Sequence, residues 1–145
     1  MPAEIRDARP EDAPAIGKLL ATLGYEPRPD LDSTLATWLA DPANRLLVAD
    51  LDGEVAGVLA LHSWPHLARA GSRARITALA VGEQARRQSL ARRLVEAAER
   101  VATELGCVEM EVTSRLHRTE AQAFYRALGY EEVSGRSARF MRELS

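Results

Sequence analysis

The chain has 145 residues, of which 46% are hydrophobic and 28% charged, a balance typical of a globular protein with one core. Its formal net charge of -2 argues against a general attraction to nucleic acid or to anionic membranes. The only cysteine, Cys107, excludes an internal disulfide and a cysteine-rich zinc site, and no apolar run approaches the roughly 20 residues of a membrane span. We therefore expect one domain, residues 1–145, in a reducing cytoplasmic compartment and without a metal.

The first third of the chain predicts a short strand followed by two helices. Residues 5–8 fit the strand, and Pro10 with the two acids after it is typical of a helix start. Apolar residues then recur at helical spacing until Gly24, which ends the run. Two prolines make residues 26–30 a loop, and a second helix is expected over residues 31–39.

The middle of the chain predicts three strands. Residues 46–51 and 55–63 flank Asp52-Gly53, a dipeptide typical of a tight hairpin turn. Residues 64–72, which include a proline and a glycine, are expected to connect the hairpin to a third long strand over residues 74–81.

The remaining elements alternate between helix and strand. Apolar residues line one face of a helix over residues 90–105, and residues 108–113 alternate as a strand does. A short helix is expected at 119–128, followed by two short strands near 130–133 and 138–142. This order predicts an α/β protein whose mixed sheet carries helices on its faces.

The turn between the strand at 74–81 and the next helix carries the strongest chemical signal. It contains Arg86 and Arg87, followed by the small residues Ser89 and Ala91 at the start of the helix. Exposed amides at a helix start and the helix dipole favour negative charge, so such a turn can hold a diphosphate. The turn lacks both the G-x-G-x-x-G of a dinucleotide site and the G-K-[ST] of a P-loop.

Two motifs resemble those of the GNAT superfamily of acyl-CoA-dependent N-acetyltransferases. Residues 86–91, Arg-Arg-Gln-Ser-Leu-Ala, are similar to the family's [RQ]-x-x-G-x-[GA] turn, with Ser89 where family members usually carry glycine. Residues 120–130, Glu-Ala-Gln-Ala-Phe-Tyr-Arg-Ala-Leu-Gly-Tyr, are similar to its E-A-x-x-F-Y-x-x-x-G-[FY] signature. The resemblance implies a mostly antiparallel central sheet of about six to seven strands, flanked by about four helices.

The resemblance also implies acetyl-CoA as cosubstrate, with its diphosphate on the amides of the turn. The residues that would bind the cosubstrate there are Arg86, Arg87, Gln88, Ser89, Leu90 and Ala91. The end of the preceding strand would pair its backbone with the pantetheine arm through Leu79, Ala80 and Val81. One of these strand amides would polarise the thioester carbonyl.

For the proton transfers, the resemblance implies that Tyr125 is the general acid that protonates the departing thiolate. The residue that acts as the general base stays undetermined, because Thr77 stands near the place where many family members carry a glutamate. An ordered water could act as the base, and so could four side chains: Glu109, Glu111, His62 and His66.

The acceptor is expected to be a primary amine of a small molecule or a peptide. Carboxylates in the loop after the first helix, Glu26, Asp30 and Asp32, could attract a cationic acceptor, and Trp38 and Trp64 either line the acceptor cleft or pack. Arg118 either meets the cosubstrate or faces water, while Cys107 and His117 have ordinary structural explanations. No nucleic acid or membrane partner is expected, and a homodimer is common among similar proteins.

A second function from another class stays open. Thr77 and Ser89 favour an acyl-CoA-binding or regulatory module on the same fold that does no catalysis. The C-terminal signature around Tyr125 opposes it and favours the enzyme.

Overall fold

The computed structural model describes residues 3–83, 87–113 and 119–144. They fall into two compact units, Met1–Thr113 and Ser114–Ser145.

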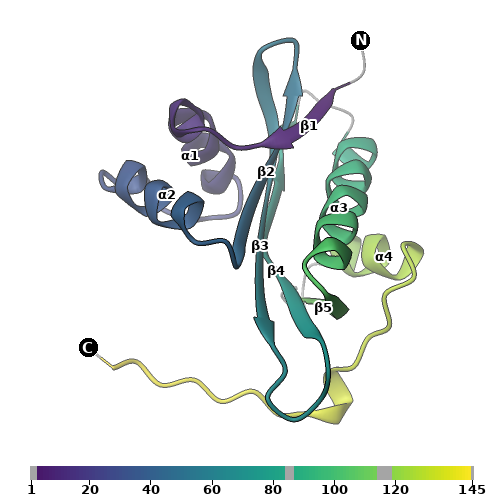
Figure 1. Ribbon diagram of the computed structural model, residues 1–145. Helices are drawn as coiled ribbons and strands as arrows, with labels where there is room; N and C mark the ends of the chain where they lie inside the picture. Colours follow the sequence, from purple (N-terminus) through teal and green to yellow (C-terminus); the bar gives the residue numbers. More distant parts are fainter. Residues whose placement is uncertain (1–2, 84–86, 114–118, 145) are drawn as a thin grey trace. The chain divides into compact units, whose positions relative to one another are not determined.

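The first unit is built on one five-stranded sheet in which every strand lies beside its neighbours in the sequence (Figure 1). The first three pairings are antiparallel, and only the last, between β4 and β5, is parallel, because α3 crosses over between those two strands. The strands are β1 (Glu4–Asp7), β2 (Asn44–Leu51), β3 (Glu54–Pro65), β4 (Ser72–Val81) and β5 (Cys107–Val112).

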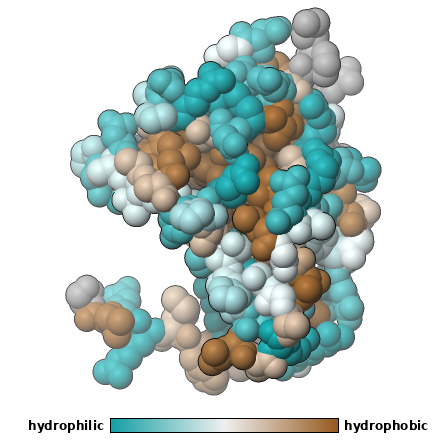
Figure 2. Space-filling model, viewed as in Figure 1, coloured by the Kyte–Doolittle hydropathy of each residue, from teal (hydrophilic) through white to brown (hydrophobic). Residues whose placement is uncertain are grey.

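Helices cover both faces of this sheet. The turn η1 (Pro10–Asp12) leads into α1 (Ala13–Ala21), which lies with α2 (Leu31–Ala40) on one face, whereas α3 (Arg87–Glu104) lies on the other (Figure 1). Figure 2 shows that the outward surface of α1 and α2 is mostly hydrophilic, as expected for amphipathic helices that bury one side.

Both faces of the sheet are buried where the helices pack on β2, β3 and β4. On the α1–α2 face, Ile16, Leu19 and Leu35 pack against alternate residues of β2, β3 and β4. On the opposite face Leu59, Leu61 and Leu94 are buried to 0% exposure. Gly57 lets α3 approach closely, since a Cβ there would lie 3.0 Å from Leu94 Cδ1.

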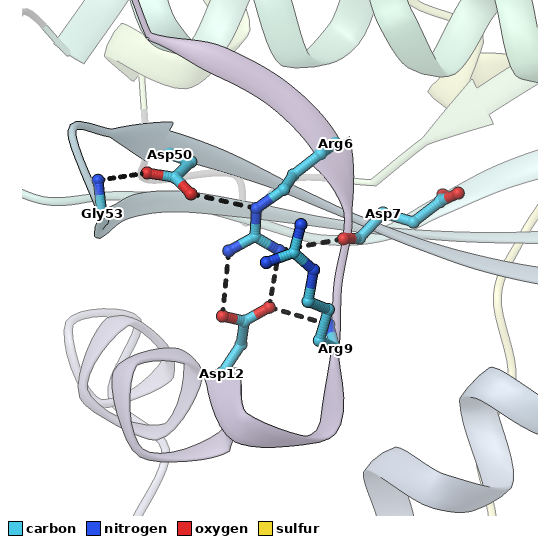
Figure 3. Close-up of polar contacts among 6 residues, drawn as sticks. All are labelled: Arg6, Asp7, Arg9, Asp12, Asp50 and Gly53. Atoms are coloured by element: carbon cyan, nitrogen blue, oxygen red, sulfur yellow. Dashed lines mark hydrogen bonds and ion pairs between the residues drawn. The ribbon is translucent and has the colours of Figure 1, made fainter.

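An ionic cluster joins β1 to the turn η1 and to the β2–β3 hairpin (Figure 3). The guanidinium of Arg6 donates from Nη1 and Nη2 to the two carboxylate oxygens of Asp12, at 2.9 and 3.1 Å, and from Nε to Asp50 Oδ2 at 3.0 Å. Asp12 Oδ2 also accepts the backbone N–H of Arg9 at 2.7 Å. The Arg6 guanidinium therefore holds the pKa of Asp12 and Asp50 below the usual range, and the Asp12 carboxylate raises that of Arg6.

The hairpin turn has the predicted dipeptide in the conformation that it requires. Asp52 and Gly53 both have positive φ, 52° and 89°, as the tight turn between antiparallel strands demands. The Gly53 N–H donates to Asp50 Oδ1 at 2.6 Å, so the turn and the ionic cluster share a residue.

The second unit contains α4 (Thr119–Ala127) and the turn η2 (Ser134–Arg136). The two strands expected near 130–133 and 138–142 are wrong: these residues are not in strands, so the sheet has five strands instead of six or seven. Phe140 and Met141 are 90% and 80% exposed. Alternating sequence alone does not make a strand without a neighbour to pair with.

Several boundaries also differ from the expectation by a few residues, including the following two. β3 continues through Trp64 to Pro65, so the connection to β4 is only residues 66–71. The first helix is split, because Pro10 starts a 3-10 turn before α1.

Candidate functional site

The candidate site lies where β4 loses one of its two neighbours. β4 pairs with β3 up to Val81, whereas its parallel pairing with β5 ends at Ile76 opposite Val112. Among the described residues, the edge of β4 over Thr77–Val81 thus has no strand partner on the β5 side. An unpaired edge presents backbone donors and acceptors in a row.

The direction of these backbone groups follows from one hydrogen bond. The N–H of Gly82 donates to Ala56 O of β3 at 2.8 Å, so the backbone of Val81 points to the opposite side. Alternation then turns Leu79 to the open edge as well and Ala80 toward β3. Three strand residues are predicted to meet the cosubstrate. Of these, Leu79 and Val81 direct their main-chain N–H and C=O groups to the unpaired edge of β4.

A bulge marks the start of this open edge. Leu61 pairs with Ile76 and Ala60 with Ala78, which leaves Thr77 as an extra residue on β4. Its hydroxyl lies 3.4 Å from Ala60 O. Bulges redirect side chains and end pairing. Thr77, near which the resemblance places a glutamate, is therefore also the residue at which the pairing of β4 with β3 shifts.

The predicted diphosphate turn is described in part. Arg86 lies outside the described residues, whereas Arg87, Gln88, Ser89, Leu90 and Ala91 lie in the N-terminal part of α3. Ser89 is helical and exposed, and among the described non-glycine residues only Asp52 has positive φ. Serine in place of glycine therefore introduces no backbone strain here.

Glu109, a candidate base, is occupied by cations. Its Oε1 accepts hydrogen bonds from Nε and Nη2 of Arg73, at 2.8 and 2.6 Å, and lies 3.4 Å from Arg69 Nη2. His66 Nε2 is also within 2.9 Å of the same oxygen. The Arg73 guanidinium lowers the pKa of Glu109, which makes this carboxylate a weaker base, and the contact ties up Nε2 of His66.

The other two candidate bases differ in their surroundings. Glu111 Oε1 is 4.0 Å from Arg75 Nη1. His62 Nδ1 lies 2.6 Å from Asn44 Oδ1, and its ring stacks on Trp64 with centroids 5.4 Å apart and planes at 23°. Trp64 is thus a neighbour of a candidate base, while Trp38 packs against the core under α2.

Tyr125 lies in the second unit, on α4. Gly129, at φ 95°, ends the helix, and the N–H groups of Gly129 and Tyr130 donate to the carbonyls of Arg126 and Tyr125, both at 3.0 Å. The rings of Tyr125 and Tyr130 meet edge to face, 5.9 Å apart. The glycine of the predicted signature thus ends the helix that carries Tyr125.

The remaining predicted residues have structural surroundings. Asp30 is paired with Arg28 Nη2 at 2.8 Å, which neutralises part of the acidic loop, and Glu26 and Asp32 are exposed. Cys107 is half-buried at the start of β5, and burial raises the pKa of its thiol. His117 and Arg118 lie outside the described residues.

A cavity of about 670 Å³ opens between α1, the start of β3 and Gly82. Four carboxyl side chains line it together with Lys18, namely Glu11, Asp12, Glu54 and Glu83. This charge is unsuited to a diphosphate, so the cavity is not where the phosphates of a coenzyme would bind.

Sequence reasoning missed two features of the site. The bulge at Thr77 has no composition signal, because it arises from the register between β3 and β4. Asn44, the partner of His62, is 18 positions away in the chain, and only the pairing of β2 with β3 brings the two together.

A sequence model of the acetyltransferase (GNAT) family matches residues 7–130, so the chain belongs to that family. The chain is similar to the aminoalkylphosphonate N-acetyltransferase of Salmonella typhimurium, with 30% identity over 134 residues that cover 89% of this chain and 85% of the relative. The mixed sheet with an open β4 edge is therefore that of an acetyltransferase family.

Solved structures share the fold. A transcriptional regulator from Bacillus halodurans superposes with a TM-score of 0.87 at 24% identity, covering 97% of this chain and 99% of that one. An aminoglycoside acetyltransferase from an uncultured soil metagenomic sample superposes with a TM-score of 0.82, also at 24% identity, covering 99% and 97%. Within the described residues, no helix is both long and apolar enough to cross a membrane.

Proposed function

We propose that the protein is an acetyl-CoA-dependent N-acetyltransferase, in which the acceptor amine attacks the thioester directly in a ternary complex. The observation that carries this proposal is the unpaired edge of β4 over Thr77–Val81, at the end of the strand that leads into α3. The pantetheine arm contains amides, and the outward backbone groups of Leu79 and Val81 would pair with it as a strand would.

With the pantetheine arm along β4, the other parts of the cosubstrate would meet residues nearby in the sequence and Tyr125. Amides of residues 87–91 would hold the diphosphate, with Arg86 and Arg87 adding charge. A strand amide at the opening would donate to the thioester oxygen as negative charge develops on it. Tyr125 would protonate the departing thiolate, because a phenol carries its proton at neutral pH.

Binding is tested with coenzyme A and acetyl-CoA by calorimetry and thermal denaturation. At 100 times the dissociation constant, a ligand that binds only the folded state adds about 2.7 kcal/mol to the free energy of unfolding. Both ligands are expected to raise the melting temperature. No heat and no thermal shift from either one would contradict the proposal.

Turnover separates the enzyme from a non-catalytic acyl-CoA-binding module. Thiol release from acetyl-CoA is measured with a panel of primary amines: 2-aminoethylphosphonate, spermidine, an aminoglycoside, an amino acid and a short peptide. We expect turnover of at least one amine and, in Tyr125→Phe, a fall in kcat of about 100-fold with coenzyme A affinity retained. Tight binding without turnover of any amine supports the module.

The acceptor class rests on the relative in Salmonella, and we infer that aminoalkylphosphonates are the first acceptors to test. Arg75 on β4 would favour an amine that carries an anionic group, because its guanidinium can pair with a phosphonate. Its side chain is 33% exposed, its Nη1 lies 4.0 Å from Glu111 Oε1, and its Nη2 donates to Thr113 Oγ1 at 3.2 Å. Arg75→Gln should therefore raise the KM for 2-aminoethylphosphonate by about tenfold and leave that for spermidine unchanged. If Arg75→Gln leaves the KM for 2-aminoethylphosphonate equal to that of the wild type, this assignment is contradicted.

A further inference from the structure

His62 is half-buried and lies outside the core that packs under α1 and α2. It is a β3 residue whose register partners are Asn44 on β2 and Arg75 on β4. The core under α1 and α2 reaches Ala60 on β3 but does not include His62. Within the first unit α3 covers the opposite face (Figure 1), so a substrate would approach the end of the β4–β5 pairing on the face that carries His62.

The contact between His62 and Asn44 favours one neutral tautomer of the imidazole. An amide oxygen only accepts hydrogen bonds, so the 2.6 Å contact with Asn44 Oδ1 places the proton of the neutral imidazole on Nδ1. Nε2 is then left with its lone pair and can accept a proton. The stacked ring of Trp64 holds the plane of the imidazole.

The register also sets the distance to the bulge. His62 lies opposite Arg75, two residues before Thr77 along β4. With roughly 4.8 Å between strands and 3.4 Å per residue, the two Cα atoms are about 8 Å apart. An amine that binds between Thr77 and His62 would lie within hydrogen-bonding reach of the imidazole, directly or through one water.

We propose that His62 is the base of the acetyl transfer, with Asn44 as the residue that positions it. This inference rests on the proposed function and fills the role that Thr77 cannot play. Two of the competing side chains are occupied: Glu109 accepts from arginines, and His66 contacts Glu109 through Nε2. Glu111 lies 4.0 Å from Arg75 Nη1, beyond hydrogen-bonding distance, and stays a competitor.

The proton transfers balance as follows. An ammonium acceptor loses one proton to Nε2 of His62, and the freed nitrogen lone pair forms a bond to the thioester carbon. The carbon–sulfur bond breaks, and its electron pair leaves on sulfur, which takes a proton from Tyr125. The nitrogen's second proton restores Tyr125 through solvent, and His62 releases its proton to water. Acetyl-CoA and an ammonium ion thus give an amide, free coenzyme A and one proton.

The first test needs no substrate. Long-range proton–nitrogen NMR of the folded protein distinguishes the two neutral tautomers of each histidine, and His62→Gln assigns the signal. We expect His62 to carry its proton on Nδ1, and Asn44→Leu to shift it toward the Nε2–H form that free histidine prefers. A protonated Nε2 and bare Nδ1 in the wild type would overturn the proposal.

The second test uses turnover of the best amine in the panel. His62→Ala should lower kcat by about 100-fold, leave the KM for acetyl-CoA within about twofold, and regain activity when imidazole is added. The matched control is His66→Ala, a histidine in the connection just after β3, which should keep its kcat. Asn44→Leu should lose activity and Asn44→Asp should retain it, because a carboxylate also accepts from Nδ1.

The results distinguish a failure of the proposed function from a failure of the role assigned to His62. If the wild type acetylates none of the amines, the proposed function fails and this inference falls with it. If the wild type is active but folded His62→Ala keeps its kcat or gains nothing from imidazole, only this inference is overturned. Circular dichroism melts show that each variant is folded.

Discussion

At the scale of single residues, Arg6 joins three parts of the first unit through two carboxylates. Its side chain is 13% exposed and that of Asp12 only 8%, so water screens the pair little. The geometry with Asp12 is bidentate, which matches the planar guanidinium to the carboxylate. Removing one partner is costly, because the other charge then stays desolvated without compensation.

Asp12→Ala should therefore lower the free energy of unfolding by about 2 to 3 kcal/mol in urea denaturation. The control is Asp30→Ala, which removes a similar contact at the surface, where the side chains of Arg28 and Asp30 are 52% and 59% exposed. That variant should leave the urea midpoint unchanged. Equal losses in the two variants would show that burial is not what gives the Arg6 cluster its importance.

At the scale of elements, close packing of α3 on the sheet depends on a position without a side chain. A Cβ at Gly57 would lie 3.0 Å from Leu94 Cδ1 and 3.5 Å from Ala80 O. Gly57→Val should destabilise the fold by about 2 kcal/mol, because α3 must move or the core must rearrange. Gly135→Ala, where a Cβ would meet nothing within 4 Å, is the control, and both are measured by urea denaturation. A fully stable Gly57→Val would contradict the close approach.

The sequence predicts those elements whose signals are local. Three such signals each predict a structure from only a few residues: the Asp52-Gly53 turn, the helical spacing of the α3 residues and the glycine after α4. Register and pairing depend on distant partners. For that reason the bulge at Thr77 and the Asn44–His62 contact could not be read, and the strands expected near 130–133 and 138–142 were wrong.

At the scale of the whole molecule, several carboxylates have their pKa lowered by arginines. Arg6 lowers the pKa of Asp12 and Asp50, and Arg73 lowers that of Glu109. Their unfolded pKa values are about 4, so the unfolded chain takes up protons first as the pH falls. The stability that these groups contribute is complete above about pH 5 and is lost as the pH falls through their folded pKa values.

The free energy of unfolding should therefore be level from about pH 5 to pH 7 and fall steadily below about pH 4. Urea denaturation at a series of pH values measures this profile. Asp12→Ala should have a shallower acid limb than the wild type, since one of the shifted groups is gone. A wild-type stability at pH 3 equal to that at pH 6 would contradict the assignment.

Because the open edge of β4 consists of main-chain atoms, proline is the one encoded residue that removes a donor there, and it also fixes φ and so disturbs the strand. Val81 Cγ2 lies near the position of a Gly57 Cβ, so its side chain packs on the α3 side and a substitution there would report a change in the core instead. Replacing the amide of Leu79 or Val81 by an ester through chemical synthesis deletes one N–H and leaves every side chain in place. Nature can accordingly vary the residues along this strand while keeping the same row of peptide groups.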